Sequence, residues 1–137
     1  MKKLVAVSLF AAVFASALSA RAVDEDAYKK LMKEAGGAGG RVKKAIEAKS
    51  QEAVVKDAER IEVLFKEMAG FWETKTVKDG AKWSHEAEAA AHKIVVAAKA
   101  GDFEKAREEL GAYQKSCKGC HEAHREKVGE HEYKFKY

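Results

Sequence analysis

Two cysteines and a histidine stand close together near the C-terminal end of this sequence of 137 residues. The segment CKGCH places Cys117 and Cys120 three positions apart, and His121 follows directly after the second thiol. Residues three apart lie on the same face of a helix, so both sulfurs can act on one group. Four kinds of chemistry use thiols at this spacing: a disulfide, a redox-active dithiol, a zinc site, and the covalent attachment of a haem.

The surroundings of the motif discriminate between these four chemistries. A disulfide suits an exported protein, whereas redox-active C-x-x-C pairs belong to a strand–helix–strand pattern that this sequence lacks. A zinc site would add His124, but four ligands crowded on one helix are awkward for a tetrahedral shell. C-x-x-C-H is the attachment signature of c-type haem, in which the thiols form thioethers with the porphyrin and the histidine binds the iron. We therefore favour one covalently bound haem c, and the other three chemistries remain alternatives.

The position of the motif limits where a second axial ligand can come from. Because CKGCH lies near the C-terminus, such a ligand must come mainly from upstream. The candidates are two thioethers and four imidazoles: Met32, Met68, His85, His92, His124 and His131. His124 is too near His121 on the same helix to reach the opposite face of the ring, and Met68 fits the buried stripe of a core helix.

The first 22 residues have the composition of an export signal. A basic start, MKK, precedes the apolar run LVAVSLFAAVFASAL and the small-residue motif ARA. We interpret residues 1–22 as the cleaved signal peptide of a periplasmic protein whose mature chain begins at Val23. Cleavage after Ala20 and an uncleaved membrane anchor are the alternatives. Cleavage at Val23 removes three basic residues and no acid, which lowers the formal net charge from +4 to +1, so we expect no nucleic-acid partner.

Composition and periodicity predict an all-α protein. The chain has no proline, and its apolar residues recur at alternating spacings of three and four, as on helices that pack along one stripe. Four helices are predicted: from the N-cap Asp24 to Lys49, from Gln51 to Ala69, from the N-cap Ser84 to Gly101, and onward from the N-cap Asp102. Residues 70–83 are predicted as a loop long enough to join helices that are not neighbours. We expect one domain, residues 23–137, folded as an antiparallel four-helix bundle, with no role assigned to the tail at 130–137.

Two segments resemble a known family. AAKAGDFEKAREELGAYQKSCKGCHEAHR and YKKLMKEAGGAGGRV are similar to the last and first helices of the class II c-type cytochromes, which include cytochrome c′ and its low-spin relatives. The resemblance spans the mature chain up to Lys127. It implies thioether bonds from Cys117 and Cys120, His121 as the proximal iron ligand, and Arg125 as the basic residue beside that histidine.

The resemblance also gives the first helix a role. It implies that Met32 lies over the iron, and Gly36 and Gly40 fall at positions that are often small in the family. These three residues are four apart and share one helical face. If Met32 binds iron, larger side chains at the two glycines would collide with the porphyrin, so we expect the helix to continue through them; a loop is the alternative. His124 departs from the family, which usually has Tyr or Phe there.

Two aromatic residues complete the expected haem pocket. Trp72 and Trp83 flank the predicted loop, and we expect them to close the end of the bundle near the haem edge. Tyr28, one turn before Met32, is expected in the same region, either packed in the core or bonded to a haem propionate.

The expected function depends on whether Met32 binds the iron. His/Met ligation raises the haem potential and closes the iron to other ligands, as in a periplasmic one-electron carrier that meets redox partner proteins. The alternative is a five-coordinate, cytochrome c′-like protein that binds nitric oxide or carbon monoxide. We expect no enzymatic activity, because a peroxidase would need a distal histidine or arginine that the first helix does not offer. Many members of the family form dimers, which leaves a homodimer open.

Overall fold

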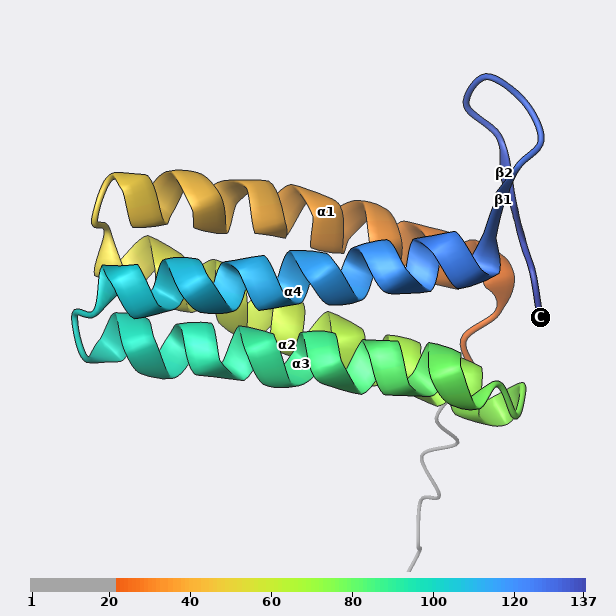
Figure 1. Cartoon of the computed structure of the whole chain (residues 1–137), viewed down its shortest axis with the longest axis horizontal. Coiled ribbons are helices and arrows are strands. Elements are labelled where there is room, and N and C mark those ends of the chain that lie inside the picture. Colours follow the sequence, from red (N-terminus) through yellow and green to blue (C-terminus); the bar gives the residue numbers. More distant parts are fainter. Residues whose placement is uncertain (1–21) are drawn as a thin grey trace, which may run out of the picture.

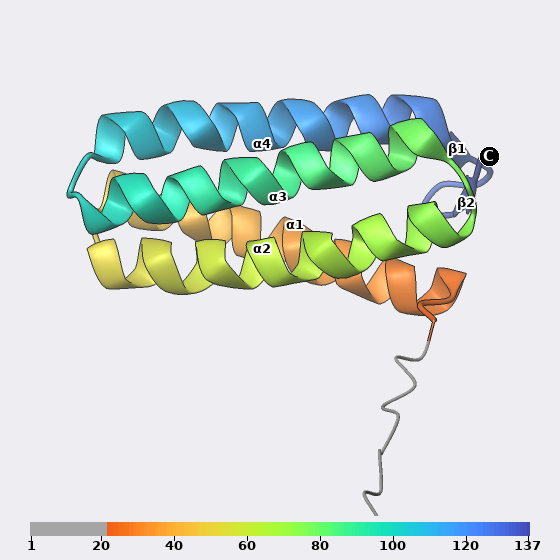
Figure 2. The same cartoon turned by 90° about the horizontal axis from the view of Figure 1, so that it is seen from below.

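The computed structural model describes residues 22–137, so residues 1–21 of the predicted signal peptide lie outside the described part. The described residues form four helices and a short hairpin: α1 Glu25–Glu47, α2 Gln51–Thr74, α3 Lys78–Lys99, α4 Phe103–His124, β1 Arg125–Lys127 and β2 Tyr133–Phe135. The helices lie along the long axis of the molecule and alternate in direction (Figure 1 and Figure 2). The predicted antiparallel four-helix bundle is confirmed.

Side-chain caps fix where two of the helices begin. Oδ1 of Asp24 accepts a hydrogen bond from Ala27 N at 2.8 Å, and Oδ1 of Asp102 accepts one from Lys105 N at 2.9 Å. Each cap satisfies a backbone N–H that has no partner within its helix, which contributes about 1 kcal/mol. Both N-caps were predicted from the sequence. Ser50 stands at the N-cap position of α2 but makes no cap bond with its side chain.

Three-residue connections join consecutive helices. Each contains one residue with a positive φ: Lys49 at 52°, Thr76 at 58° and Gly101 at 73°. A left-handed residue turns the chain sharply at the end of a helix. Connections this short make successive helices antiparallel neighbours.

The prediction of a loop at 70–83 is wrong, because all of this segment except 75–77 is helical. α2 continues to Thr74 because Phe71 and Trp72 extend its buried stripe, each with 1% of its surface exposed. Burying two large aromatic side chains outweighs the weak loop signals of the glycines and threonines in this segment. The connection is too short to link helices that are not neighbours, so α2 and α3 pack side by side.

Gly80 lets α3 approach α2 at this end. A Cβ at this position would lie 2.5 Å from the Trp72 ring, so a side chain here would displace the indole. Ser84 is not the predicted N-cap. It lies within α3, 2% exposed, and its hydroxyl donates a hydrogen bond to the Gly80 carbonyl at 3.0 Å.

The core contains apolar side chains from all four helices. Its largest fully buried apolar members are Trp72, Phe71, Ile46, Ile61, Leu64, Met68, Ile94, Val42 and Val54. Met68 is therefore a core residue, as predicted. Among the neighbouring helix pairs, α1 and α4 pack least closely. Within residues 22–137, no helix combines the length and the apolar character needed to span a membrane.

The C-terminal residues fold back as a two-stranded antiparallel hairpin, which the all-α prediction did not include. Its register pairs Arg125 with Phe135 and Lys127 with Tyr133. The backbone N–H of Lys136 donates to the carbonyl of His124 at 2.9 Å and so ties the hairpin to α4. Figure 1 shows the hairpin at the end of the bundle where α4 ends and α1 begins.

Candidate functional site

Two adjoining cavities lie between α1 and α4, toward the hairpin end of the bundle. Their volumes are about 640 Å³ and about 790 Å³, within the range of pockets that hold small molecules and cofactors. Four residues border both cavities: Met32, His121, Arg125 and Tyr133. Because they share these walls, we treat the two cavities as one slot.

The α1 wall of the slot carries Met32, Gly36 and Gly40. α1 is unbroken through the glycines, so the prediction that the helix continues is confirmed. A Cβ added at Gly36 or Gly40 would meet no atom within 4 Å, whereas one at Gly39 would lie 3.1 Å from the Tyr113 ring. Gly39 therefore serves helix packing, while Gly36 and Gly40 leave this wall of the slot bare.

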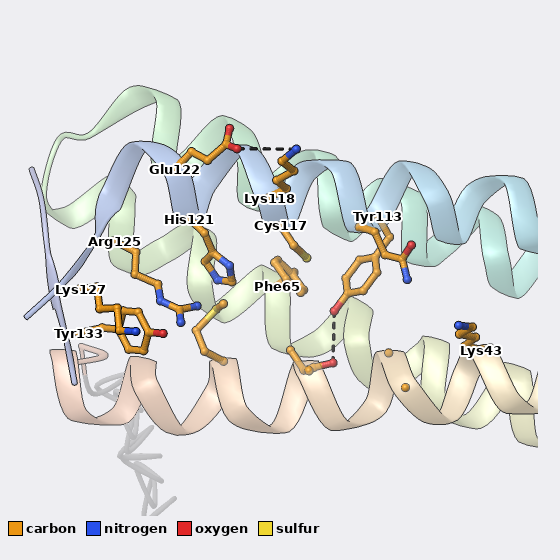
Figure 3. A pocket seen from close by; sticks show the side chains of 16 residues that line it. Lys43, Phe65, Tyr113, Cys117, Lys118, His121, Glu122, Arg125, Lys127 and Tyr133 are labelled. Carbon is orange, nitrogen blue, oxygen red and sulfur yellow. Dashed lines mark hydrogen bonds and ion pairs between the residues drawn. The ribbon is translucent and has the colours of Figure 1, made fainter. Parts of the chain in front are cut away.

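The α4 wall carries Cys117 and His121, and Cys120 borders the second cavity. All three are half-buried. Figure 3 shows the side chains of Cys117 and His121 pointing from α4 toward α1. Farther from the hairpin, the hydroxyl of Tyr113 donates to the carbonyl of Ala35 at 3.2 Å and joins α4 to α1.

Burial controls the protonation of these groups. It raises the pKa of the Cys117 thiol, and burial together with the neighbouring Cys117 and Asp79 raises the pKa of Cys120 to about 12. Burial and the nearby Arg125 charge lower the pKa of His121. A neutral imidazole is the form that binds a metal. Protonated thiols are poor nucleophiles for dithiol exchange, which argues against the redox-dithiol alternative.

The structure separates His121 from His124. His124 is 7% exposed, and its ring lies against Trp72 with the ring centres 4.7 Å apart. In the part of the chain that the structure describes, no three His, Cys, Asp or Glu side chains gather as a metal site. The zinc alternative therefore has no support. No disulfide joins Cys117 and Cys120.

Tyr28 and Trp72 border the second cavity, as part of its apolar wall. They are 4% and 1% exposed, and Trp72 Nε1 donates to Tyr28 Oη at 2.8 Å. Desolvation raises the pKa of the Tyr28 hydroxyl. Of the two roles expected for Tyr28, core packing is the one that this geometry supports. Trp83 packs over Gly119 of α4, where a Cβ would lie 2.8 Å from the indole.

His124 fastens the hairpin to the bundle. Its Nδ1 lies 2.8 Å from the Lys136 carbonyl, and because a carbonyl only accepts, Nδ1 carries the proton. Nε2 is buried, 3.1 Å from Oδ1 of Asp79 but without the geometry of a hydrogen bond. The position at which the family usually has Tyr or Phe thus holds the C-terminal tail in this chain.

The residues that line the rest of the slot were not predicted from the sequence. Tyr133 of β2 borders both cavities, and six lysines line one or the other of them: Lys29, Lys33, Lys43, Lys118, Lys127 and Lys134. A signal for the hairpin was present, because YKFKY alternates aromatic and basic residues with the period of a strand. Arg125 was predicted, and it also borders both cavities.

Four antiparallel helices, with a C-x-x-C-H motif on the last helix facing a slot against the first, are the arrangement that the resemblance to class II cytochromes implies. Among solved structures, the chain is similar to cytochrome c′ from Rubrivivax gelatinosus, with a TM-score of 0.57 and 18% sequence identity. The similarity covers 69% of this chain and 88% of that chain. No protein-family model and no curated protein matches the sequence. The chain has the four-helix-bundle fold of cytochrome c′.

Proposed function

We propose that this chain is a periplasmic c-type cytochrome that carries one electron at a time on a single, covalently bound haem. The observation that carries the proposal is that Met32 of α1 and His121 of α4 border the same slot from facing helices. The likeness of the fold to cytochrome c′ supports it. The predicted signal peptide also supports it. Because c-type haem is attached outside the cytoplasm, the chain must be exported to receive one.

The residues around the slot fit a haem. Gly36 and Gly40 leave the α1 wall bare, so a flat ring can lie close to that helix. Cys117 and Cys120 stand on the opposite side at the spacing of the two thioether bonds. His121, with its lowered pKa, offers a neutral imidazole between them and the hairpin.

When bound, the haem iron supplies reversible one-electron transfer. In this proposal His121 and Met32 would hold the iron, and such a pair of ligands would raise the potential and exclude other ligands. Phe65 and Tyr113, each 5% exposed, line the inner side of the slot and keep water from it.

Basic side chains dominate the edge of the slot. Of the nine Lys, Arg, Asp and Glu residues that border it, seven are basic and two, Glu122 and Glu132, are acidic. The predicted mature chain carries a net charge of only +1, so its positive charge is concentrated here. We therefore propose that its redox partners present an acidic surface.

One observation favours a second candidate function, the binding of nitric oxide or carbon monoxide at five-coordinate iron. Gly36 lies one turn beyond Met32, and its open surroundings leave room for a small molecule beside the thioether. We propose no enzymatic reaction, because α1 contributes neither histidine nor arginine to the walls of the slot.

The visible spectrum of the reduced protein, with and without carbon monoxide, tests the proposal. Sharp low-spin bands that the gas leaves unchanged are expected for the electron carrier. Broad high-spin bands that shift with the gas would favour the second candidate. A colourless protein without iron would overturn both.

A further inference from the structure

The C-terminal hairpin forms one wall of the slot, and the proposed function gives this wall no role. Tyr133 of β2 borders both cavities, although 39% of it is exposed. The guanidinium carbon of Arg125 lies 3.5 Å from the centre of the Tyr133 ring. Figure 3 shows the two side chains together at the hairpin end of the slot, with Arg125 next to His121.

Arg125 is held both by its backbone and by its guanidinium group. Its backbone caps α4 and pairs with Phe135 in the hairpin ladder. Within residues 22–137, Arg41 and Arg60 are the arginines that pair with carboxylates, whereas the Arg125 guanidinium lies over the Tyr133 ring. A guanidinium over an aromatic face is attracted to it by about 0.5–2 kcal/mol, depending on exposure.

The hairpin that presents Tyr133 is itself anchored in the core. The Phe135 ring lies 5.3 Å from that of Tyr28, 5.4 Å from Phe71 and 5.8 Å from Trp72, between ring centres. Residues two apart on a strand point to the same side, so the packing of half-buried Phe135 against the core turns Tyr133 toward the slot. The packing of Phe135 therefore sets the side of the hairpin on which the Tyr133 ring lies.

We propose that Tyr133 is a positioning residue, which holds the positive charge of Arg125 beside His121 and thereby raises the reduction potential of the haem. This inference rests on the proposed function. A fixed positive charge near the iron favours the reduced state, which carries one positive charge fewer. Without the ring, the exposed Arg125 side chain would turn into water, where its charge is screened.

The contact between the two side chains is tested by NMR of the full chain, which can be read whether or not haem is attached. The ring current of Tyr133 is expected to shift the Arg125 side-chain resonances upfield. The upfield shift persists in Tyr133→Phe, which keeps the ring, and is lost in Tyr133→Leu. Tyr137→Leu is the matched control, because Tyr137 follows β2 closely but borders neither cavity. An unchanged Arg125 spectrum in Tyr133→Leu would overturn the inference.

The effect on the haem is tested by a double-mutant cycle of reduction potentials. Arg125→Gln and Tyr133→Leu are each expected to lower the potential, and the double variant lies no lower than Arg125→Gln alone. Tyr133→Phe and Tyr137→Leu keep the wild-type value. Additive shifts, or a normal potential in a haem-loaded Tyr133→Leu, would overturn the inference and leave the proposed function intact. A chain without haem would overturn the proposed function, and the inference with it, while the NMR comparison still reports on the pair.

Discussion

Met32 and His121 face the same slot, although they stand near opposite ends of the mature chain. Three short connections bring this about, because each reverses the chain and the fourth helix returns alongside the first. A methionine far from C-x-x-C-H in sequence therefore lies across the slot from His121 of that motif. The fold, and not the local sequence, brings Met32 and His121 to the same slot.

Replacing Met32 by alanine is expected to convert the reduced protein from low spin to high spin and to let carbon monoxide bind. The physical reason is that the proposed ligand, the Met32 thioether, would be lost and the iron would be open to the gas. Absorption spectra with and without carbon monoxide measure the change. Met68→Leu is the matched control, because Met68 is fully buried in the core and a volume-conserving change there costs less than about 1.5 kcal/mol. Low-spin bands that persist in Met32→Ala would exclude Met32 as the ligand.

Gly36→Leu is expected to impair haem attachment, because the new side chain projects into the slot where nothing else lies within 4 Å. Gly37→Leu is the control on the same helix, since its Cβ meets only the Arg41 guanidinium at an ordinary 3.5 Å. Both changes remove a helical glycine and are expected to stabilise the haem-free chain by about 0.5–1 kcal/mol. Haem content per chain and urea unfolding separate the two effects. Equal haem content in both variants would contradict the close approach of the ring to α1.

The parts of the site that follow local rules could be predicted from the sequence. Cys117 and His121 share a face because of helical spacing, and Asp24 and Asp102 cap helices because a carboxylate satisfies the free N–H groups nearby. The continuous helix through Gly36 was predicted from the resemblance and from the need for a bare wall. Each of these features depends on residues a few positions apart.

The features that were missed depend on residues far apart in the sequence. The segment 70–83 contains weak helix formers, and only the burial of Phe71 and Trp72 against other helices makes it helical. The hairpin strands are three residues long, too short for a clear pattern of their own. Their position depends on Phe135 packing beside Tyr28, at the other end of the chain.

The hydrogen bond from Trp72 to Tyr28 is expected to stabilise the end of the bundle. Trp72→Phe removes the donor and leaves the buried Tyr28 hydroxyl without this hydrogen bond. The free energy of unfolding is expected to fall by about 1–3 kcal/mol for the lost bond. It falls further because the smaller ring leaves a cavity. Urea unfolding measures this cost. The double variant with Tyr28→Phe is expected to lose less than the sum of the two single changes, because the bond is lost only once. A strictly additive result would show that the bond contributes nothing.

His85 is expected to give a small pH dependence to stability. Its Nε2 lies 2.9 Å from Glu73 and its Nδ1 3.2 Å from Glu88, and these carboxylates, Glu73 first, raise the pKa of His85. A raised pKa in the folded state adds stability that is complete below the unfolded value of about 6.5 and is lost as the pH rises through the folded value. Because His85 is largely exposed, the effect is small and screened by salt.

The His85 prediction is measured by NMR titration and by unfolding at several pH values. The Glu73→Gln variant is expected to bring the pKa of His85 back toward about 6.5. His85→Gln is expected to lower stability at acidic pH and to leave it unchanged at alkaline pH. A His85 that titrates at its ordinary value in the wild-type chain contradicts the prediction.

The basic edge of the slot is expected to steer acidic partners, which a small anionic oxidant such as ferricyanide can represent. Lys33 and Lys43 border the slot from α1, so Lys33→Glu and Lys43→Glu are expected to slow oxidation of the reduced protein at low salt and to change it little at high salt. Lys56→Glu makes the same charge change on α2, outside the slot, and is expected to have the smaller effect. A cationic oxidant must show the opposite order, because the same substitutions then attract the reagent. If oxidation by both reagents becomes slower, the substitutions have damaged the site. The charge at the edge of the slot then does not determine how fast the protein meets the oxidant.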